Sequence, residues 1–506
     1  MHRKILIFGK EISNFITENM MLIAIMVCVT ISILSRAYFD LSYISPDSAQ
    51  YLLAAREILR GNGFHVYPDW FAIWPIGYPA LIAIVAFITR AEIYLASKIL
   101  SIIIVWIIGL MLYKHFGRTA WAYAFVMLNV GFRYIFFYTW SETVFLLAMV
   151  LLTFWVADIV ACDNVKASHY VKLTLAVLLL FLSRYIGAFA LSVIGLLWLG
   201  NSYSAIRHKC KIAGRRVIYL TISGIVSGVF ILSYLLMNQK MTGYMTGIER
   251  VPAGPMRELL LDLYRAMMIE MDYVFDTFFA IGPARLALLL WFGLIGFFIY
   301  AISKSKKGII ARDKNIITPL CFIVIGIIYW VAIIIMRLAS HFDDFDFRLL
   351  FSGSAMLFIG FIGLLTQNEK VKSFLIHFSG KAIPVICLSG FLLMMLVITP
   401  RLQGTAGYRQ VKDTTLSTYA AIPDGAMVLW GDTVHLLFMR DNLGASFVNP
   451  EHDMASFWDE YQDYEEVYIF VPEMKEWLVV DFDVNSEIYA FFGQYVDSDE
   501  EFVRIK

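Results

Sequence analysis

The stretch SPDSAQYLLAAREILRGNGF, residues 45–64, lies between two long apolar runs and decides the fold. It begins with a serine, a proline and Asp47, which are typical of the first turn of a helix. The following residues place apolar side chains on one face and charged side chains on another, and a Gly-Asn-Gly segment ends the helix. The pattern predicts a short amphipathic helix on the outer surface of a membrane. Helix capping explains Asp47 by itself, and a catalytic role is the alternative.

The composition indicates a membrane protein. Of the 506 residues, 59% are hydrophobic and 16% are charged, whereas soluble globular chains carry about 25% charged residues. This composition and length disfavour a single soluble core. We therefore expect a polytopic α-helical membrane protein.

Apolar runs that span the hydrocarbon layer need about 20 residues. The run 73–113 is long enough for two helices, whereas the run 170–200 is too long for one crossing and short for two. Whichever of these is a hairpin, about eleven crossings result. The expected runs are 20–38, 73–113, 119–138, 141–160, 170–200, 217–237, 283–302, 315–336, 349–366 and 382–399.

Basic loops predict the orientation, because cytoplasmic loops retain Lys and Arg. With the basic clusters and the N-terminus inside, a multi-pass protein of a bacterial inner (plasma) membrane is expected. Its outer loops would be 39–72, 238–282 and 337–348. If 170–200 is a hairpin and 73–113 crosses once, Lys114 and Arg118 lie inside and Glu142 outside. The other arrangement reverses both assignments, and the basic loop 114–118 favours the first.

The last hundred residues differ in charge from the rest of the chain. Residues 401–506 hold 7 Lys and Arg against 20 Asp and Glu, whereas residues 1–400 hold an excess of basic residues. Buried strands are expected at 426–432 and 465–472, with a helix between them. We therefore predict a transmembrane domain over 1–400 and a small acidic α/β domain over 401–506 outside the membrane. Its negative charge does not favour a nucleic-acid partner.

Four motifs, in order, resemble a known family. They are the opening stretch 45–64, WPIGYPALIA at 74–83, YTWSETVFLLAMVLL at 138–152 and FLSRYIGAFAL at 181–191. Together they resemble the type-C (GT-C) membrane glycosyltransferase superfamily, in the branch that holds protein O-mannosyltransferases and bacterial aminoarabinose transferase. The resemblance covers about residues 15–240 and fades to hydropathy and charge placement beyond them.

The resemblance implies roles for three residues. Asp47 matches the catalytic carboxylate of the first outer loop, Glu142 a second acid or metal ligand, and Arg184 a basic residue that faces the carrier phosphate. The chain departs from many relatives at Trp74, where they carry a basic residue. The residues alone leave alternatives, since Arg184 also suits a structural ion pair and Glu142 an acid that starts a helix.

The loop 337–348 adds further candidates. Arg337 and Arg348 are secondary candidates for binding the donor phosphate. The loop's acids at 343, 344 and 346, with His341, could hold a divalent metal, although a solvated loop explains them as well. The sequence therefore implies no cofactor, and a divalent metal stays an alternative.

These residues suit sugar transfer from a polyprenyl-phosphate donor to a hydroxyl of a glycan, lipid or protein. One carboxylate takes the proton of the acceptor, arginines stabilise the leaving phosphate, and a single carboxylate base predicts inversion at the anomeric carbon. The partners would be membrane lipids and the lipid-linked sugar, which is a substrate. A transporter or flippase of lipid-linked sugar is the alternative function, although the chain shows no internal repeat of the kind many transporters have.

Overall fold

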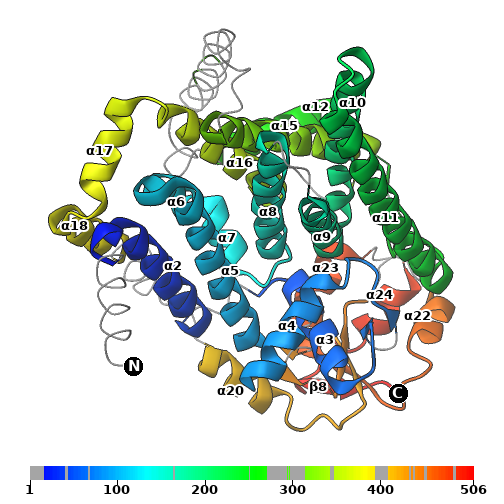
Figure 1. The fold of residues 1–506 in the computed structure, drawn as a ribbon. Helices are drawn as coiled ribbons and strands as arrows, with labels where there is room; N and C mark the ends of the chain where they lie inside the picture. The colour runs from blue at the N-terminus through cyan, green and yellow to red at the C-terminus, as the bar shows by residue number, and fades with distance from the viewer. Residues whose placement is uncertain are drawn as a thin grey trace.

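The structure is a computed structural model of the whole chain, drawn in Figure 1. It describes residues 16–39, 44–66, 69–162, 166–249, 251–252, 254–269, 293, 296, 314–341, 347–393, 408–431, 435–436, 439–440, 442–448, 453–482 and 486–506.

Most of the described chain forms a helical bundle. Seven described helices are long and apolar enough to cross a membrane, or eight if a bent pair counts as one span. Helices suit this setting because they satisfy their own backbone hydrogen bonds. The seven spans contain α2 (Met20–Phe39), α5 (Ile93–Phe116), α8 (Glu142–Ala161), α10 (Ala190–Arg207), α11 (Lys211–Thr242), α15 (Lys314–Ala339) and α16 (Phe347–Leu365). The span of α5 continues to Leu128, and that of α10 begins at Tyr185. The bent pair is α17 (Glu369–Ser379) and α18 (Ala382–Leu393).

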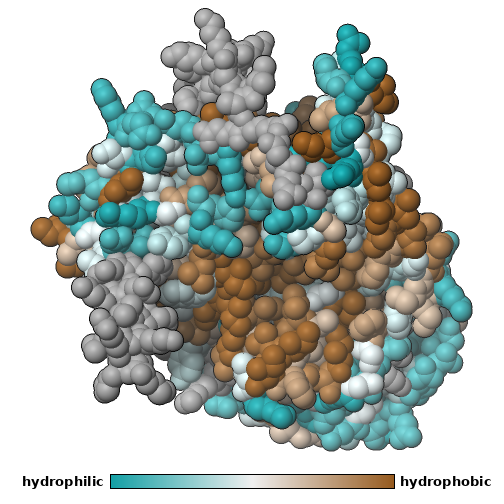
Figure 2. All heavy atoms as spheres, in the orientation of Figure 1, coloured by the Kyte–Doolittle hydropathy of each residue, from teal (hydrophilic) through white to brown (hydrophobic). Residues whose placement is uncertain are grey.

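The outer surface of the bundle is apolar across its middle. Figure 2 shows a broad hydrophobic belt with hydrophilic residues gathered above and below it. Helix α11 shows the same feature residue by residue, because Ile218, Ile225 and Val229 are all at least half exposed. A belt of exposed apolar side chains fits a hydrocarbon environment, whereas soluble monomers rarely carry such a large patch.

Both ambiguous apolar runs are divided into two helices. The run 170–200 breaks at Arg184 into α9 (Ala167–Ser183) and α10. The run 73–113 forms α4 (Gly77–Thr89) and α5, and α4 is about 20 Å long, which is too short to cross the bilayer. In each run one helix, α4 or α9, is shorter than the candidate spans, so neither predicted arrangement is confirmed.

The prediction of one continuous span over 119–138 is wrong. The chain there forms α6 (Ala120–Ala124), a 3₁₀ turn and α7 (Val130–Phe137). The break lies at Asn129, whose extended backbone and side-chain hydrogen bond to the amide of Gly131 start a new helix. The expected span at 283–302 lies almost wholly outside the described residues, and the number of eleven crossings is not confirmed.

The opening stretch forms α3 (Pro46–Arg60), as its pattern predicts. Ser45 caps the helix by accepting from the amide of Ser48 at 3.2 Å, and Gly61 ends it at φ +84°. Tyr51 and Leu52 are buried on one face. A two-stranded hairpin of β1 (His65–Val66) and β2 (Asp69–Trp70) follows. The loop 238–282 contains α12 (Met256–Ile269), and β3 (Val251–Pro252) pairs with β4 (Ser340–His341).

The acidic segment contains a small four-stranded sheet. Both predicted strands are confirmed as β5 (Met427–Leu429) and β7 (Val467–Phe470), whereas the helix expected between them lies mostly outside the described residues. The strand order is β6-β5-β7-β8, with β6 (Gly444–Ser446) and β7 parallel to β5 and β8 (Phe502–Arg504) antiparallel to β7. The helices around it are α20 (Tyr408–Thr418), α22 (Met454–Glu460), α23 (Val471–Asp481) and α24 (Glu487–Gly493).

This sheet and α3 lie at the same end of the molecule. Figure 1 shows them at the bottom and the connection between α10 and α11 at the top. An ion pair of 3.4 Å between Lys412 of α20 and Glu92, just before α5, joins the acidic segment to the bundle. The basic connection 207–211 therefore lies at the end of the bundle opposite to α3 (Figure 1).

Candidate functional site

Four charged side chains from distant parts of the sequence meet in one cluster, which we call the ion-pair cluster: Asp47, Glu142, Arg184 and Arg348. Arg348, at the start of α16, pairs with Asp47 through one nitrogen and with Glu142 through another, the latter at 2.5 Å. Arg184 pairs with the same oxygen of Glu142. Two acids and two arginines make the ion-pair cluster neutral as a whole.

Asp47 is the more accessible acid of the cluster. Its side chain is 22% exposed, whereas that of Glu142 is 1% exposed. Because Ser45 supplies the capping hydrogen bond of α3, the carboxylate of Asp47 is turned toward Arg348 instead of the helix backbone. The residue that caps α3 is therefore Ser45, and not Asp47.

Glu142 lies at the first position of α8, where the positive end of the helix dipole favours an acid. Burying a carboxylate is costly unless it is paired, and here two guanidinium groups pair with it. Arg184 reaches it from the break between α9 and the 3₁₀ turn at 185–189, where its extended backbone ends α9. The ion-pair cluster is therefore built from four helix ends.

The turn 138–141, which leads into Glu142, contacts both α3 and Arg348. The guanidinium of Arg348 lies 4.5 Å from the centre of the Trp140 ring, and Trp140 donates to the hydroxyl of Ser45 at 2.8 Å. The phenol of Tyr51 donates to Ser141 at 3.0 Å. Burial raises the pKa of Tyr51 well above its ordinary value, and the charge of Glu142 raises it further, so the phenol stays a neutral donor.

Sequence reasoning did not assign Tyr51 or Trp140 a role. Trp140 stands two residues before Glu142, inside one of the four motifs, and Tyr51 follows Asp47 by one helical turn. That spacing places Tyr51 on the same face of α3 as Asp47, which was the signal available in the sequence.

A second group of polar contacts fixes the loop before α4. Asn238 of α11 is fully buried, accepts from the indole of Trp70 at 3.2 Å and donates to the phenol of Tyr185 at 2.7 Å. Tyr185 in turn donates to the carbonyl of Ala72.

Trp74 stands where many relatives carry a basic residue. The centre of its ring lies 5.2 Å from the centre of the Tyr51 ring. The position therefore contributes an aromatic surface in this chain.

Other predicted candidates are not brought into the ion-pair cluster. Arg337 is 3% exposed in α15, and no contact described in the structure joins it to Asp47 or Glu142. Within the described residues, no group of three or more His, Cys, Asp or Glu side chains is placed to hold a metal. Asp343, Asp344 and Asp346, and the side chain of His341, lie outside the described residues.

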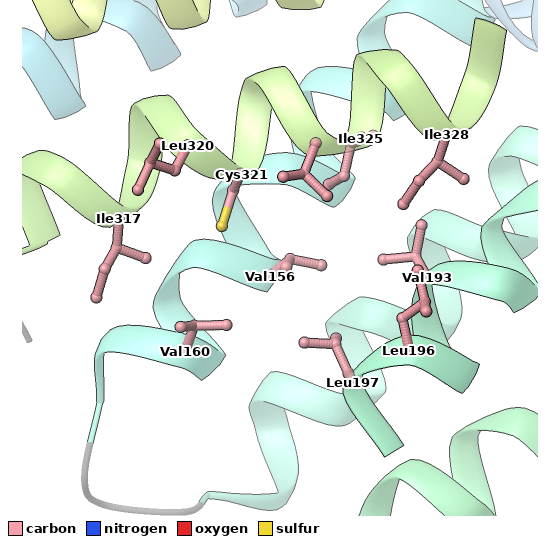
Figure 3. Close-up of a pocket in the computed structure, with 11 residues that line it drawn as sticks. Val156, Val160, Val193, Leu196, Leu197, Ile317, Leu320, Cys321, Ile325 and Ile328 are labelled. Carbon is pink, nitrogen blue, oxygen red and sulfur yellow. The ribbon is translucent and has the colours of Figure 1, made fainter. Parts of the chain in front are cut away.

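A cavity of about 510 Å³ lies elsewhere in the bundle, between α8, α10 and α15. Figure 3 shows Val156, Val193 and Cys321 projecting toward it from these three helices. Val156 lies 14 residues along α8 from Glu142, which is about 21 Å. The lining is apolar apart from the thiol, so the cavity lacks groups that would bind a sugar or a phosphate.

No protein-family model and no curated protein sequence matches the chain. Among solved structures, it is similar to the Archaeoglobus fulgidus oligosaccharyltransferase in complex with Zn and sulfate, with a TM-score of 0.47 and 12% identity over 92% of this chain and 70% of that one. It is also similar to ArnT from Cupriavidus metallidurans bound to undecaprenyl phosphate, with a TM-score of 0.45 and 11% identity over 91% of this chain and 94% of that one. Both are GT-C glycosyltransferases, the family that the sequence motifs resemble.

Proposed function

We propose that the chain is an inverting membrane glycosyltransferase. It moves a sugar from a polyprenyl-phosphate donor to an acceptor hydroxyl at the outer face of the membrane. The observation that supports this proposal is the ion-pair cluster, in which one partly exposed carboxylate and two arginines meet at one end of an apolar bundle.

In the proposed reaction, Asp47 acts on the acceptor. Its carboxylate takes the proton of the acceptor hydroxyl while the acceptor oxygen forms a bond to the anomeric carbon of the sugar. The bond from that carbon to the phosphate oxygen breaks, and its electron pair stays on the phosphate. Attack from the side opposite to the phosphate inverts the configuration, by analogy with the inverting glycosidases.

The arginines act on the leaving group. The phosphate gains negative charge as the bond to the sugar breaks, and guanidinium groups stabilise that charge with paired hydrogen bonds. Arg184 and Arg348 are the proposed contacts, and Arg337 stays a secondary candidate. A phosphate that engages Arg348 competes with Asp47 for it, so donor binding would release Asp47 to act as a base.

Glu142 positions the arginines in this scheme. It is too buried to meet an acceptor directly, and it binds both guanidinium groups through one oxygen. Glu142 is also the carboxylate proposed as a metal ligand, and Asp47 is the other described carboxylate of the cluster. The proposed roles of Asp47 and of the two arginines need neither a nucleotide nor a redox cofactor.

The first experiment identifies the donor. The protein is purified in mild detergent, and the lipids that copurify with it are analysed by mass spectrometry. We expect a polyprenyl phosphate or its sugar derivative from the wild-type chain, and a large loss of it from a variant with both Arg184→Ala and Arg348→Ala. A matched variant with Arg207→Ala and Arg215→Ala, at the opposite end of the bundle, should keep the lipid. Phospholipids alone in all three samples would contradict the proposed donor.

The orientation needs its own test. In a cysteine-free background, Asn62→Cys and Asp459→Cys should react with a membrane-impermeant maleimide added to intact cells, whereas His208→Cys should react only after permeabilisation. All three positions are exposed in the structure. Labelling of His208→Cys alone in intact cells would place the ion-pair cluster on the cytoplasmic side.

A further inference from the structure

Lys98 is a buried lysine that the proposed chemistry does not use. It lies in the second turn of α5, in a helix that is a candidate membrane span, and it is 0% exposed. Ionisable side chains inside a membrane helix are costly, and they usually mark a functional site. Packing alone does not account for Lys98, because methionine has a similar length and carries no charge.

The ammonium of Lys98 binds the end of one helix and the turn that follows it. It donates to the carbonyl of Phe137 at 2.5 Å and to the hydroxyl of Thr139 at 3.2 Å, and it lies 5.0 Å from the centre of the Tyr94 ring. Phe137 is the last residue of α7, so its carbonyl lies at the negative end of the helix dipole. Lys98 therefore closes α7 from a neighbouring helix.

The segment held by Lys98 continues directly into the ion-pair cluster. Thr139 also bonds to the hydroxyl of Ser97 at 3.0 Å, and its amide donates to Ser48 at 3.3 Å. Trp140 lies against Arg348, and Glu142 follows after one more residue. A shift of the turn 138–141 would therefore move Glu142, and with it both arginines.

We propose that Lys98 is a positioning residue: its ammonium, bound to Phe137 and Thr139, fixes the turn 138–141 so that Glu142 reaches Arg184 and Arg348 together. The role deepens the proposed function, since it rests on the ion-pair cluster being the donor site. Lys98 itself touches neither proposed substrate.

The deciding experiment is a double-mutant cycle on the thermal midpoint of the full chain in detergent. In the test cycle, Lys98→Met and Glu142→Gln are made singly and together. In the control cycle, Ile104→Ala takes the place of Lys98→Met, because it removes a buried side chain from the same helix. If Lys98 positions Glu142, the loss in Tm of the double variant falls short of the summed single losses by about 2 °C or more. The control cycle should be additive. Additivity in both cycles would overturn the proposal.

A conservative variant separates positioning from folding. Lys98→Gln keeps one donor for the carbonyl of Phe137 and removes the charge, so it should recover part of the coupling to Glu142. If Lys98→Met does not fold, the cycle with Lys98→Gln decides the question by the same criterion of additivity.

A second measurement connects the role to the donor. Binding of undecaprenyl phosphate to the purified chain should weaken about tenfold in Lys98→Met and stay unchanged in Ile104→Ala. Equal affinities for the wild type and Lys98→Met would overturn the positioning role. A wild-type chain that does not bind this lipid would instead contradict the proposed donor, and the double-mutant cycle would still decide the role of Lys98.

Discussion

Glu142 and Lys98 are both buried ionisable side chains, and they are stabilised in different ways. Glu142 is neutralised by two opposite charges, whereas Lys98 is held by a carbonyl, a hydroxyl and an aromatic ring. Ion pairs can be exchanged when another anion competes for the same arginines, but a helix carbonyl stays bound to its lysine. The comparison teaches that this site combines an exchangeable part, suited to a charged substrate, with a fixed part that sets its geometry.

The largest expected effect tests the exchangeable part. Glu142→Ala leaves two arginines buried without their shared carboxylate, and breaking a buried ion pair in this way costs about 3–5 kcal/mol of stability. Lys98→Met leaves a buried carbonyl without its donor, which costs about 1–3 kcal/mol. Thermal unfolding of both purified variants should therefore show a lower Tm for Glu142→Ala. The reverse order would show that Lys98, and not the carboxylate, carries the greater part of the stability.

Asp47→Asn tests whether the exposed acid of the same cluster does chemistry. Removal of a general base lowers the rate by a factor of about 10² or more. Ser45 still caps the helix, but the ion pair with Arg348 is lost, so some loss of Tm is expected and the rate is compared per folded molecule. The measurement is consumption of the lipid-linked sugar by equal amounts of folded protein. Glu57→Gln, on the same helix and paired with Arg60, is the matched control and should keep the wild-type rate. Wild-type transfer by Asp47→Asn would remove Asp47 from the mechanism.

Arg184 tests how the guanidinium groups are used. Because the phosphate gains charge toward the transition state, Arg184→Ala should lower kcat as well as donor binding, each by about tenfold or more. Arg184→Lys should retain part of the activity, since the charge remains while the paired hydrogen bonds are lost. Turnover and Tm are measured on the same samples. A destabilised Ala variant with normal activity per folded molecule would assign Arg184 a structural role only.

Arg337 should give the smallest effect. The ion pairs of the cluster are made by Arg184 and Arg348, and lysine keeps the charge at position 337, so Arg337→Lys should change transfer less than about threefold, within about 0.7 kcal/mol of the wild-type barrier. Arg348→Lys should lose more, because its guanidinium binds two carboxylates at once. Steady-state rates at saturating donor give the comparison. A larger loss in Arg337→Lys than in Arg348→Lys would reverse the two assignments.

Local sequence signals predicted the elements that carry the site. The cap, proline and glycine around 45–64 predicted α3, and Glu142 stands at the start of α8 as an acid at a helix end. The motif resemblance singled out Asp47, Glu142 and Arg184. In the structure Arg184 pairs directly with Glu142, and Arg348 joins Asp47 to Glu142. The proposed catalytic roles of these residues stay predictions.

Long-range geometry was not available from the sequence. Arg348 lies 206 residues from Glu142, and no local pattern separates it from Arg337 eleven residues earlier. Lys98 stands in an apolar run without any motif, so only the distance to Phe137 shows what it binds. The break at Asn129 was missed because the apolar run continues through it, and a single capping side chain overrides that pattern.

The double engagement of Arg348 has a consequence for the order in which substrates combine. While Arg348 is paired with Asp47, an acceptor that arrives first meets a carboxylate already in an ion pair. A donor phosphate that binds Arg348 releases the carboxylate of Asp47. We therefore expect a compulsory sequence with the donor first and the acceptor second. In initial-rate kinetics a non-reacting acceptor analogue would then be an uncompetitive inhibitor against the donor, and a competitive pattern would exclude that order. An enzyme arranged in this way keeps its base unavailable until there is a sugar to transfer.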